Sequence, residues 1–377
     1  MTPLLSIIIP TKGRYNYLKE ILDLILSFDS KEFELIIQDN TSDNAVFIPF
    51  LNTINDPRFK YYYESSHLTS VENFDKAVLN TSGKYIAFIG DDDFLLRNIC
   101  DIVSFMNNND IDAVKFRRAN YYWSDDFRKN SLLTTGLYSK KIKYLSPIES
   151  LKKVLSNGCQ EIDLLPSLYY GIVKKESLDK IYAIGNTYFP GNSADIANGV
   201  ALSFFIKKYA FINLPIIVPG TSRNTGGGVY AKKNKTLSLD EVSFISKKAI
   251  EKWDSSLPRI WNGSLVWPES ALSALKYVDR RDFIQYLNYK NIWLAYSDIS
   301  HEFFLDAKKR YRNSLSFYIA KSRVFMVRVI RSALNRIIRI IVKKYKLDGH
   351  YYANIGSIVE AEEFLYNEIK CYCCRFL

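Results

Sequence analysis

The sequence predicts an α/β protein whose N-terminal part is a mostly parallel, mixed sheet and whose C-terminal region is mainly α-helical. Three observations predict this fold class. Short apolar runs alternate with helical patterns through about the first 220 residues, as in strand–helix–strand units. Each apolar run ends in a polar loop, which is typical of parallel strands covered by helices on both faces. From about residue 236 onwards, the apolar residues recur at helical spacing instead.

The N-terminal elements follow one another closely. The first strand is expected at 4–9, where the residues are uncharged and largely β-branched. A helix is expected at 15–28, because its leucines and isoleucines recur at intervals of three and four. The same reasoning predicts strands at 33–38, 59–63, 84–89 and 112–117, and helices at 44–53, 70–80 and 95–107.

The middle of the chain is less regular. Residues 119–146 are aromatic and polar without a helical period, so short strands and loops are expected there. The polar, glycine-rich stretch 221–228 is expected to form a flexible lid. Between them the pattern predicts a helix at 147–155, a strand at 167–173, helices at 175–181 and 192–208, and a strand at 211–218.

The alternation of strands and helices ends near residue 230, where we place a domain boundary. The sequence then divides into a sheet domain at 1–230 and a helical region at 231–377. In the second part, helices are expected at 237–253, 268–277, 280–299, 301–345 and 356–370.

Three polar segments follow predicted strands: Thr11 to Arg14, Asp39 to Asp43, and Asp91 to Asp93. Ligands of such sheets bind beyond the carboxyl ends of the strands, so these segments should converge on one crevice. Three adjacent carboxylates repel one another and are costly to bury without a neutralising cation. A divalent cation together with a phosphate-bearing ligand fits this need. The plainer interpretation is an exposed acidic turn that caps the next helix.

The segments Ser6–Arg14, Asp39–Asp43 and Gly83–Asp93, in this order and spacing, resemble the GT-A glycosyltransferases of family 2. These enzymes are typical of bacterial cell-surface polysaccharide synthesis. The resemblance is clear over about 4–97, is weaker to about 225 and is absent beyond 235. It implies a Rossmann-like GT-A domain that transfers a sugar from a nucleotide-sugar donor, with a UDP-sugar favoured, to a glycan or lipid-linked acceptor. It also implies inversion at the anomeric carbon.

The resemblance assigns roles to residues at the predicted strand ends. It implies that Asp93 ligates Mn²⁺ or Mg²⁺ at the diphosphate, and that Asp39 hydrogen-bonds the base. An alternative for Asp39 is a cap of the following helix. Positive charge from Arg223 or Lys12 would add to the stabilisation of the diphosphate. The residues implied at the nucleotide are Pro10, Thr11, Arg14, Asp39, Asn73, Lys76, Asp91 and Asp92.

Inversion requires a base opposite the leaving group, which takes the proton of the acceptor hydroxyl. Family members place this aspartate about a hundred residues after the acidic motif, at the start of a helix. Asp195 matches in position and context, and Asp163 is the rival candidate. The alternative for Asp195 is an ordinary carboxylate that stabilises the first turn of a helix.

A basic segment near the C-terminus accounts for the net charge of +11. Residues 307–346 hold 13 Lys and Arg and no acidic residue, which leaves 38 basic against 40 acidic residues elsewhere. Within 321–346 the apolar residues form a helical stripe beside a basic flank. This pattern favours a helix lying on an anionic membrane surface. The alternatives are a core-packing helix with a solvated basic face, or nucleic-acid binding, which we do not expect because no recognition motif accompanies the charge.

Other features bound the location of the protein. Five cysteines without a regular spacing favour reduced thiols in a cytosolic protein, and the three histidines lack metal-ligand spacing. We find no signal sequence and no uncharged apolar run of about 18 residues. The chain is therefore expected to be cytoplasmic and peripheral on the inner face of the cytoplasmic membrane.

Two other functions are compatible with parts of the pattern. A nucleotidyltransferase would carry a glycine-rich phosphate loop after the first strand, but Pro10 to Arg14 contains one glycine. A non-catalytic, membrane-associated assembly subunit would retain a relic nucleotide site without transfer. The Gln-x-x-Arg-Trp motif of processive family members is missing, so we expect single sugar additions rather than polymer synthesis.

Overall fold

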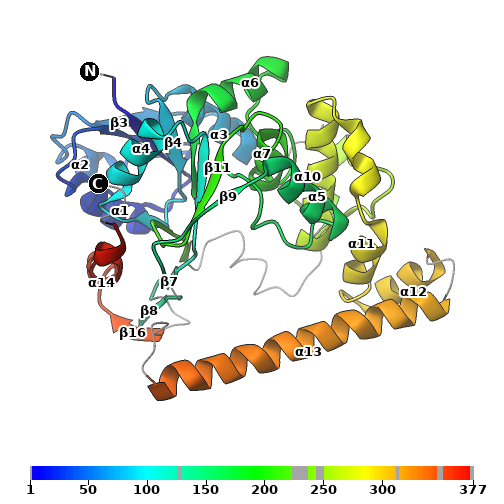
Figure 1. Cartoon of the computed structure of the whole chain (residues 1–377). Helices are drawn as coiled ribbons and strands as arrows, with labels where there is room; N and C mark the ends of the chain where they lie inside the picture. The colour runs from blue at the N-terminus through cyan, green and yellow to red at the C-terminus, as the bar shows by residue number, and fades with distance from the viewer. Residues whose placement is uncertain are drawn as a thin grey trace.

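The computed structural model of the chain describes residues 2–124, 130–136, 138–222, 237–242, 250–310, 314–345 and 351–373. An eight-stranded sheet forms the centre of the N-terminal part (Figure 1). Its strands, in spatial order, are β3 (Phe59–Tyr63), β2 (Phe33–Asp39), β1 (Leu5–Thr11), β4 (Tyr85–Phe88), β10 (Gly171–Lys174), β6 (Ala113–Phe116), β11 (Tyr209–Ile212) and β9 (Ile142–Leu145).

The sheet is mixed but mostly parallel, as predicted. β2 pairs in parallel with both β1 and β3, and β1 pairs in parallel with β4. β10 lies antiparallel between β4 and β6, while β11 is parallel to β6 and β9 closes the edge antiparallel to β11. The strand expected at 211–218 is instead split into β11 and β12 (Ile217–Val218). Pro215 lies in the break, where its ring removes a backbone donor from the ladder.

Helices cover both faces of the sheet, because successive strand residues point to opposite sides. Ile7 and Ile9 of β1 belong to the core beneath α1 (Tyr15–Leu26) and α4 (Ile99–Asn108). Ile8, between them, belongs to the opposite core, beneath α3 (Ser70–Leu79), α6 (Lys175–Gly185) and α7 (Ala194–Leu202). The short α2 (Ile48–Leu51) lies between β2 and β3 in the chain.

A third core joins the two halves of the sequence. It contains buried residues of α5 (Pro147–Ser156) and α7 together with residues of α10 (Gly263–Tyr277), α11 (Tyr289–Tyr296) and α12 (His301–Arg310). The helices that follow the predicted boundary near 230 therefore pack directly on helices that precede it (Figure 1).

Several predicted C-terminal helices have different bounds. Residues 237–242 form the short strand β14 (Leu237–Ser238), which pairs with β15 (Ile260–Trp261), and a 3₁₀ turn, η1 (Leu239–Glu241), rather than the start of a helix. The expected helix at 280–299 is divided into η2 (Arg281–Tyr286) and α11, because Asn288 caps α11 through the amide of Asn291. The expected helix at 301–345 is divided into α12 and α13 (Ser314–Tyr345).

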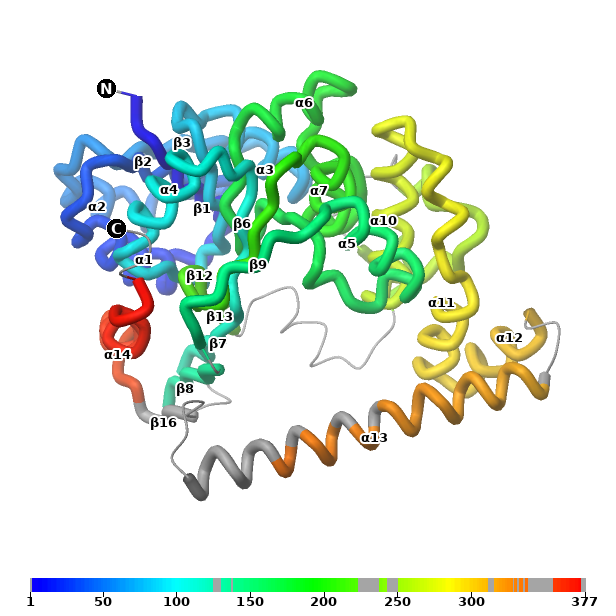
Figure 2. The backbone as a smooth tube through the Cα atoms, viewed as in Figure 1, coloured from blue at the N-terminus to red at the C-terminus, as the bar shows by residue number. Residues whose placement is uncertain are grey.

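The C-terminus returns to the N-terminal part, which the sequence did not predict. α13 is 32 residues long and crosses from α12 to β16 (Tyr351–Ile355), as Figure 2 shows. β16 pairs with β8 (Ser131–Thr134) in a small sheet with β7 (Asn120–Tyr122) and β13 (Gly220–Thr221). α14 (Ile358–Cys373) then packs on the core of α1 and α4, near β5 (Phe94–Leu95).

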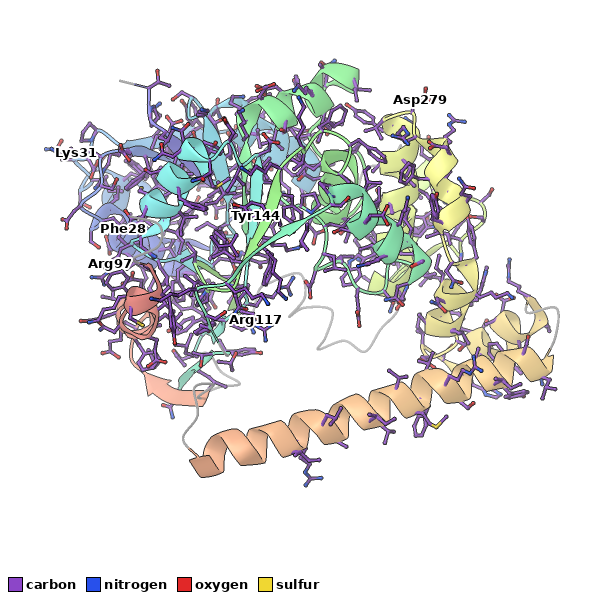
Figure 3. All side chains as sticks on the ribbon, viewed as in Figure 1. Phe28, Lys31, Arg97, Arg117, Tyr144 and Asp279 are labelled. Atoms are coloured by element: carbon purple, nitrogen blue, oxygen red, sulfur yellow. The ribbon has the colours of Figure 1, made fainter. Side chains whose placement is uncertain are left out.

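An ion pair between Arg97 and a buried carboxylate fixes this return of the chain. Glu362 of α14 is fully buried and accepts hydrogen bonds from the backbone amide and the guanidinium of Arg97. Figure 3 shows Arg97 directed at α14. Since an uncompensated buried carboxylate is costly, this pair holds α14 in one position on the sheet domain.

Within the described residues, none of the helices combines the length and the apolar character needed to cross a membrane.

Candidate active site

The carboxyl ends of β1 and β4 meet at one edge of the sheet. Thr11, the last residue of β1, donates a hydrogen bond from Oγ1 to Asp91 Oδ2 at 2.6 Å. The guanidinium of Arg14 forms an ion pair with Asp91 and lies 3.4 Å from Asp92 Oδ1. Parallel pairing of β1 with β4 brings these segments together although about 80 residues separate them in the chain.

A pocket of about 410 Å³ opens beside this network. Five residues expected at the nucleotide line it, namely Pro10, Thr11, Arg14, Asn73 and Asp91. Lys12, Asn40, His67 and the N-terminal turn of α3 complete the wall.

Asn73 places an unpaired polar group at this pocket. Its side chain is 6% exposed, and its Oδ1 atom has no hydrogen-bond partner among the described residues. A buried acceptor left unpaired costs roughly 1–3 kcal/mol, which a donor group on a bound ligand would recover.

Asp39 lies behind the pocket wall rather than in it. It is fully buried, and Oδ2 accepts hydrogen bonds of 2.7 Å from the hydroxyls of Tyr15 and Tyr61. Oδ1 accepts from the amide and the hydroxyl of Thr41. The carboxylate therefore braces the end of β2, and the internal donors occupy both of its oxygens.

Asn40 is the residue at the end of β2 that reaches the pocket. Its Nδ2 donates to the carbonyls of Glu64 and Ser66, and its Oδ1 accepts from the amide of Leu68. These bonds fix the segment that carries His67 to the pocket wall. The only signal for Asn40 in the sequence is its position directly after Asp39, at the predicted strand end.

Lys76 also lies outside the pocket wall. Its ammonium group pairs with Glu64 at 2.6 Å, on the next turn of α3 after Asn73. This ion pair holds the 64–68 segment on α3, whereas the hydrogen bonds of Asn40 hold it on the end of β2. Arg223 falls outside the described residues.

The three carboxylates of the triplet are almost fully buried, with exposed fractions of 0%, 2% and 1% for Asp91, Asp92 and Asp93. Asp93 accepts hydrogen bonds from the amides of Gly90 and Gly220, at 2.6 and 2.7 Å. It also accepts weaker bonds from the hydroxyls of Tyr169 and Tyr170, at 3.1 and 3.4 Å. The amide of Ser222 donates to Asp92.

Glycine is required where β13 approaches the triplet. A Cβ atom added at Gly220 would lie 1.7 Å from the backbone oxygen of Asp92. Only a residue without a side chain allows the Gly220 amide to reach Asp93.

Burial dominates the acidity of the triplet. It raises the pKa of Asp91 to about 6, although the charge of Arg14 acts in the opposite direction. Burial, and then the charge of Asp92, raises the pKa of Asp93 to about 7. At neutral pH the cluster thus holds more negative charge than the guanidinium of Arg14 balances.

This donor set fits a divalent cation in chemistry and charge. Carboxylate oxygens are the ligands that Mg²⁺ and Mn²⁺ prefer, and the cluster has negative charge to neutralise. Across the described parts of the chain there is no group of three His, Cys, Asp or Glu residues placed to hold a metal. A cation at Asp93 would therefore need oxygens of a bound phosphate to complete its coordination shell.

The raised pKa values predict how stability depends on pH. Because the pKa of Asp93 in the folded state exceeds its unfolded value, the folded protein binds more protons than the unfolded chain between about pH 4 and 7. The free energy of unfolding of the ligand-free protein should therefore decrease as the pH rises through this range. Urea unfolding in EDTA at pH 5 and pH 7.5 measures the difference.

The matched comparison is Asp93→Asn. The amide cannot accept from both Gly90 and Gly220, so the absolute stability of the variant should be lower. The decrease from pH 5 to pH 7.5 should nevertheless be smaller than in the wild type. An equal decrease in both proteins would show that Asp93 does not titrate in this range.

Asp195 lies in the first turn of α7, half-buried. Its Oδ1 accepts hydrogen bonds from the hydroxyl of Ser193 and from the amide of Ile196, at 2.6 and 2.9 Å. The preceding loop is held by α10, since Asn192 donates to Glu269 and the Ser193 amide donates to Ser270. The C-terminal helices thus set the position of the candidate base.

Asp163, the rival base, is more exposed and forms an ion pair with Arg118 at 2.7 Å. Both carboxylates act electrostatically on Lys115, a residue of β6 that is 5% exposed. Burial lowers the pKa of Lys115 to about 8, against the opposing charge of Asp163. The sequence did not single out Lys115, because a single lysine in a short apolar strand resembles an edge residue.

Comparison with known proteins agrees with this arrangement. Residues 6–160 match the family model described as Glycosyl transferase family 2. One relative, the GalNAc(5)-diNAcBac-PP-undecaprenol beta-1,3-glucosyltransferase of Campylobacter jejuni, is 31% identical over 96 residues, which are 25% of this chain and 31% of that protein. Another, the putative colanic acid biosynthesis glycosyl transferase WcaA of Escherichia coli, is 29% identical over 24% of this chain and 33% of its own length. The chain thus spans about a third or less of these relatives.

Solved structures show a more distant likeness. The structure of S. aureus TarS in complex with UDP-GlcNAc is 13% identical, with a TM-score of 0.47 over 78% of this chain and 80% of that one. The mannosyltransferase PcManGT of Pyrobaculum calidifontis, in complex with GDP-Man and Mn²⁺, is 13% identical, with a TM-score of 0.43 over 92% and 87%.

The mixed, mostly parallel sheet confirms the expected fold class, and the family match covers the motifs at the strand ends. Residues 6–160 of the chain thus resemble glycosyl transferase family 2.

Proposed function

We propose that the protein is an inverting, metal-dependent glycosyltransferase that moves a sugar from a nucleotide-sugar donor, with a UDP-sugar favoured, to a lipid-linked or other glycan acceptor of bacterial surface polysaccharide synthesis. The observation that carries this proposal is the pocket at the ends of β1 and β4, where Thr11 and Arg14 meet Asp91. It lies where ligands of parallel sheets bind.

The pocket offers the groups that a nucleotide needs. The unpaired Oδ1 of Asn73 would accept a hydrogen bond from a ribose hydroxyl or from the base. Asp91, ordered by Thr11 and Arg14, would accept from a second hydroxyl. Lys12 lies on the same wall and would pair with a phosphate.

The leaving group is a nucleoside diphosphate, which gains negative charge as the bond to the sugar breaks. When bound, a Mn²⁺ or Mg²⁺ ion supplies Lewis-acid stabilisation of this charge, and Asp93 is the residue that would hold it. The amides of Gly90 and Gly220 fix the Asp93 carboxylate in place.

Asp195 would serve as the base. The acceptor oxygen attacks the anomeric carbon, the bond from this carbon to the diphosphate oxygen breaks, and its electron pair leaves with the diphosphate. The hydroxyl proton passes to Asp195. The hydroxyl of Ser193 and the amide of Ile196 orient Oδ1 of Asp195. Oδ2 of Asp195 accepts no hydrogen bond from the residues that the structure describes, so it is free to accept the proton.

α13 supports a peripheral position on an anionic membrane. Its apolar side chains Phe325, Ile330, Leu334 and Ile337 are each at least half exposed, and no acidic residue lies on the helix. A relative that is 31% identical over 96 residues is named for an acceptor on undecaprenol, which is a membrane lipid. An apolar stripe with basic neighbours binds anionic surfaces through both groups.

The variant Ile330→Ser/Leu334→Ser/Ile337→Ser is expected to bind phosphatidylglycerol-containing vesicles at least about tenfold more weakly than the wild type, since each replacement removes roughly 1–2 kcal/mol of apolar transfer energy. Vesicle co-sedimentation measures this. The control carries serine at Val46, Leu79 and Ile184, which are also exposed but lie on other elements. Equal loss in both variants, or none in either, would contradict a membrane role of α13.

Transfer itself is tested with radiolabelled nucleotide sugars and the lipid-linked saccharides that chloroform–methanol extracts from the cells encoding the protein. The proposal expects label in the lipid fraction and release of a nucleoside diphosphate. Release of pyrophosphate would indicate a nucleotidyltransferase instead. Nucleotide binding without any transfer would support the non-catalytic alternative.

A further inference from the structure

A second cavity, of about 850 Å³, lies between α5, residues 157–164, α11 and α13, and we call it the α5–α13 groove. None of the residues expected at the donor or as catalytic base lines it, apart from the rival Asp163. Its volume is within the range of about 300–1,000 Å³ that is usual for ligand sites.

Contacts connect the groove to the acidic triplet. Asp163 lies in the groove wall and pairs with Arg118 at 2.7 Å. The Arg118 guanidinium lies 5.9 Å from the ring centroid of Tyr170, whose hydroxyl donates to Asp93. Lys115 interacts electrostatically with both Asp163 and Asp195. One end of the groove is therefore next to the site proposed for the reaction.

The groove wall has the chemistry of a saccharide site. Amide groups of Asn157, Gln160 and Asn291 and the carboxylate of Asp163 offer donors and acceptors for hydroxyl groups. Apolar groups such as Leu294 stand between them and suit the C–H faces of sugar rings.

The wall holds two cations, Lys153 and Arg323, and two carboxylates, Glu161 and Asp163, and the cations would bind an anionic group on the same ligand. Lys153 comes from α5 and Arg323 from α13, and neither forms an ion pair with any residue that the structure describes. A phosphate or diphosphate bound between them would make charge-assisted hydrogen bonds, which are stronger than neutral ones.

α13 connects the groove with the proposed membrane surface. Arg323, Val324 and Val327 line the groove, and the exposed apolar residues from Ile330 onwards continue along the same helix. A ligand that leaves the groove beside α13 would reach this apolar stretch directly (Figure 1).

We infer that the α5–α13 groove binds the phosphate-linked saccharide of the acceptor and presents its terminal hydroxyl to Asp195. The inference rests on the proposed function and specifies its acceptor site. The glycan lies in the groove, its phosphate lies between Lys153 and Arg323, and its lipid follows α13 to the membrane.

The test variant is Lys153→Ala/Asn157→Ala. Neither side chain has a hydrogen bond or an ion pair to another part of the described structure, so the fold should tolerate their loss. The matched control is Lys31→Ala/Asn52→Ala, in which the lysine is likewise exposed and the asparagine likewise follows the end of a helix, α2 instead of α5. Lys31 lies at the other end of the molecule (Figure 3).

The assay is the transfer of radiolabelled sugar to the extracted lipid-linked saccharides, with acceptor and donor varied separately. The test variant should raise the acceptor KM about tenfold, as expected for the loss of one charge-assisted hydrogen bond, and leave the donor KM and the kcat within about twofold. The control should match the wild type in all three constants.

An acceptor KM equal to that of the control would overturn the assignment of the α5–α13 groove as the acceptor site, while leaving the proposed function intact. A parallel rise in donor KM would also overturn it, because the residues would then act on the whole site. A wild-type protein that transfers no sugar would overturn the proposed function, and the acceptor groove with it.

Discussion

Replacing Asp195 by asparagine is expected to lower kcat for sugar transfer by about 10²–10⁴-fold, the usual contribution of a positioned general base. Donor affinity should stay within about twofold, because Asp195 does not line the pocket beside Asp91. The amide keeps an oxygen that can accept from Ser193 and the Ile196 amide, so the helix start should survive. Initial rates at saturating donor and acceptor, together with titration of the donor, give both quantities.

Two further variants separate catalysis from helix stability and from the rival base. Asp101 is also a first-turn carboxylate, in α4, so Asp101→Asn removes a comparable interaction with the helix dipole. It should leave kcat unchanged. Asp163→Asn should affect mainly the acceptor KM. A large loss of kcat in Asp163→Asn, with normal rates in Asp195→Asn, would move the role of base to Asp163.

The second large effect is expected at Asp93. In the wild type, Mn²⁺ should raise the affinity for UDP by about a hundredfold over EDTA, the equivalent of several kcal/mol of charge stabilisation. In Asp93→Asn the ratio of the UDP affinity in Mn²⁺ to the UDP affinity in EDTA should fall close to one. The ratio is the useful quantity, because it does not depend on the fraction of folded protein, and titration calorimetry with and without Mn²⁺ measures it.

Asp43→Asn is the control for Asp93→Asn. Asp43 lies in the loop after β2, but it is exposed and its Oδ1 accepts from the amide of Ala45. The ratio with this variant should equal that of the wild type. If Asp93→Asn kept the full Mn²⁺ effect, the metal would have to be held by other groups, and the assignment of Asp93 would be wrong.

Much of the sheet domain could be predicted from local patterns. The strands 4–9 and 33–38 are short, mainly apolar runs between turn residues, and the structure has β1 and β2 at the same places. Parallel pairing places all their carboxyl ends on one edge, so the meeting of Thr11 with Asp91 followed from topology alone.

Which side chain at a strand end faces a ligand could not be predicted in this way. Asp39 and Asn40 are adjacent, and the sequence does not show that Tyr15 and Tyr61 cover the carboxylate. The partners of a buried acid come from distant elements, so their number follows only from the packed structure. For the same reason the low pKa of Lys115 could not be predicted from the sequence, because it depends on burial beneath the 163–165 segment.

The return of the C-terminus to the sheet domain could not be predicted from the sequence either. β16 pairs with β8 more than 200 residues earlier, and the Glu362 carboxylate meets Arg97 across 265 residues. Periodicity within α14 predicts a helix but says nothing of the surface on which it packs. The link between α10 and the loop before Asp195 is of the same kind, since Asn192 and Glu269 are 77 residues apart.

The central claim is that the pocket between Thr11, Asn73 and Asp91 holds a nucleotide sugar. Thermal unfolding of the wild type and of Asn73→Leu, with UDP-, GDP-, CMP- and dTDP-sugars in the presence and absence of Mn²⁺, tests this claim most directly. Leucine has a similar shape but cannot accept the hydrogen bond that Asn73 Oδ1 leaves open. We expect one class of donor, UDP-sugars, to raise the melting temperature of the wild type with Mn²⁺, and to raise that of Asn73→Leu clearly less. No stabilisation of the wild type by any of the donors would contradict the account.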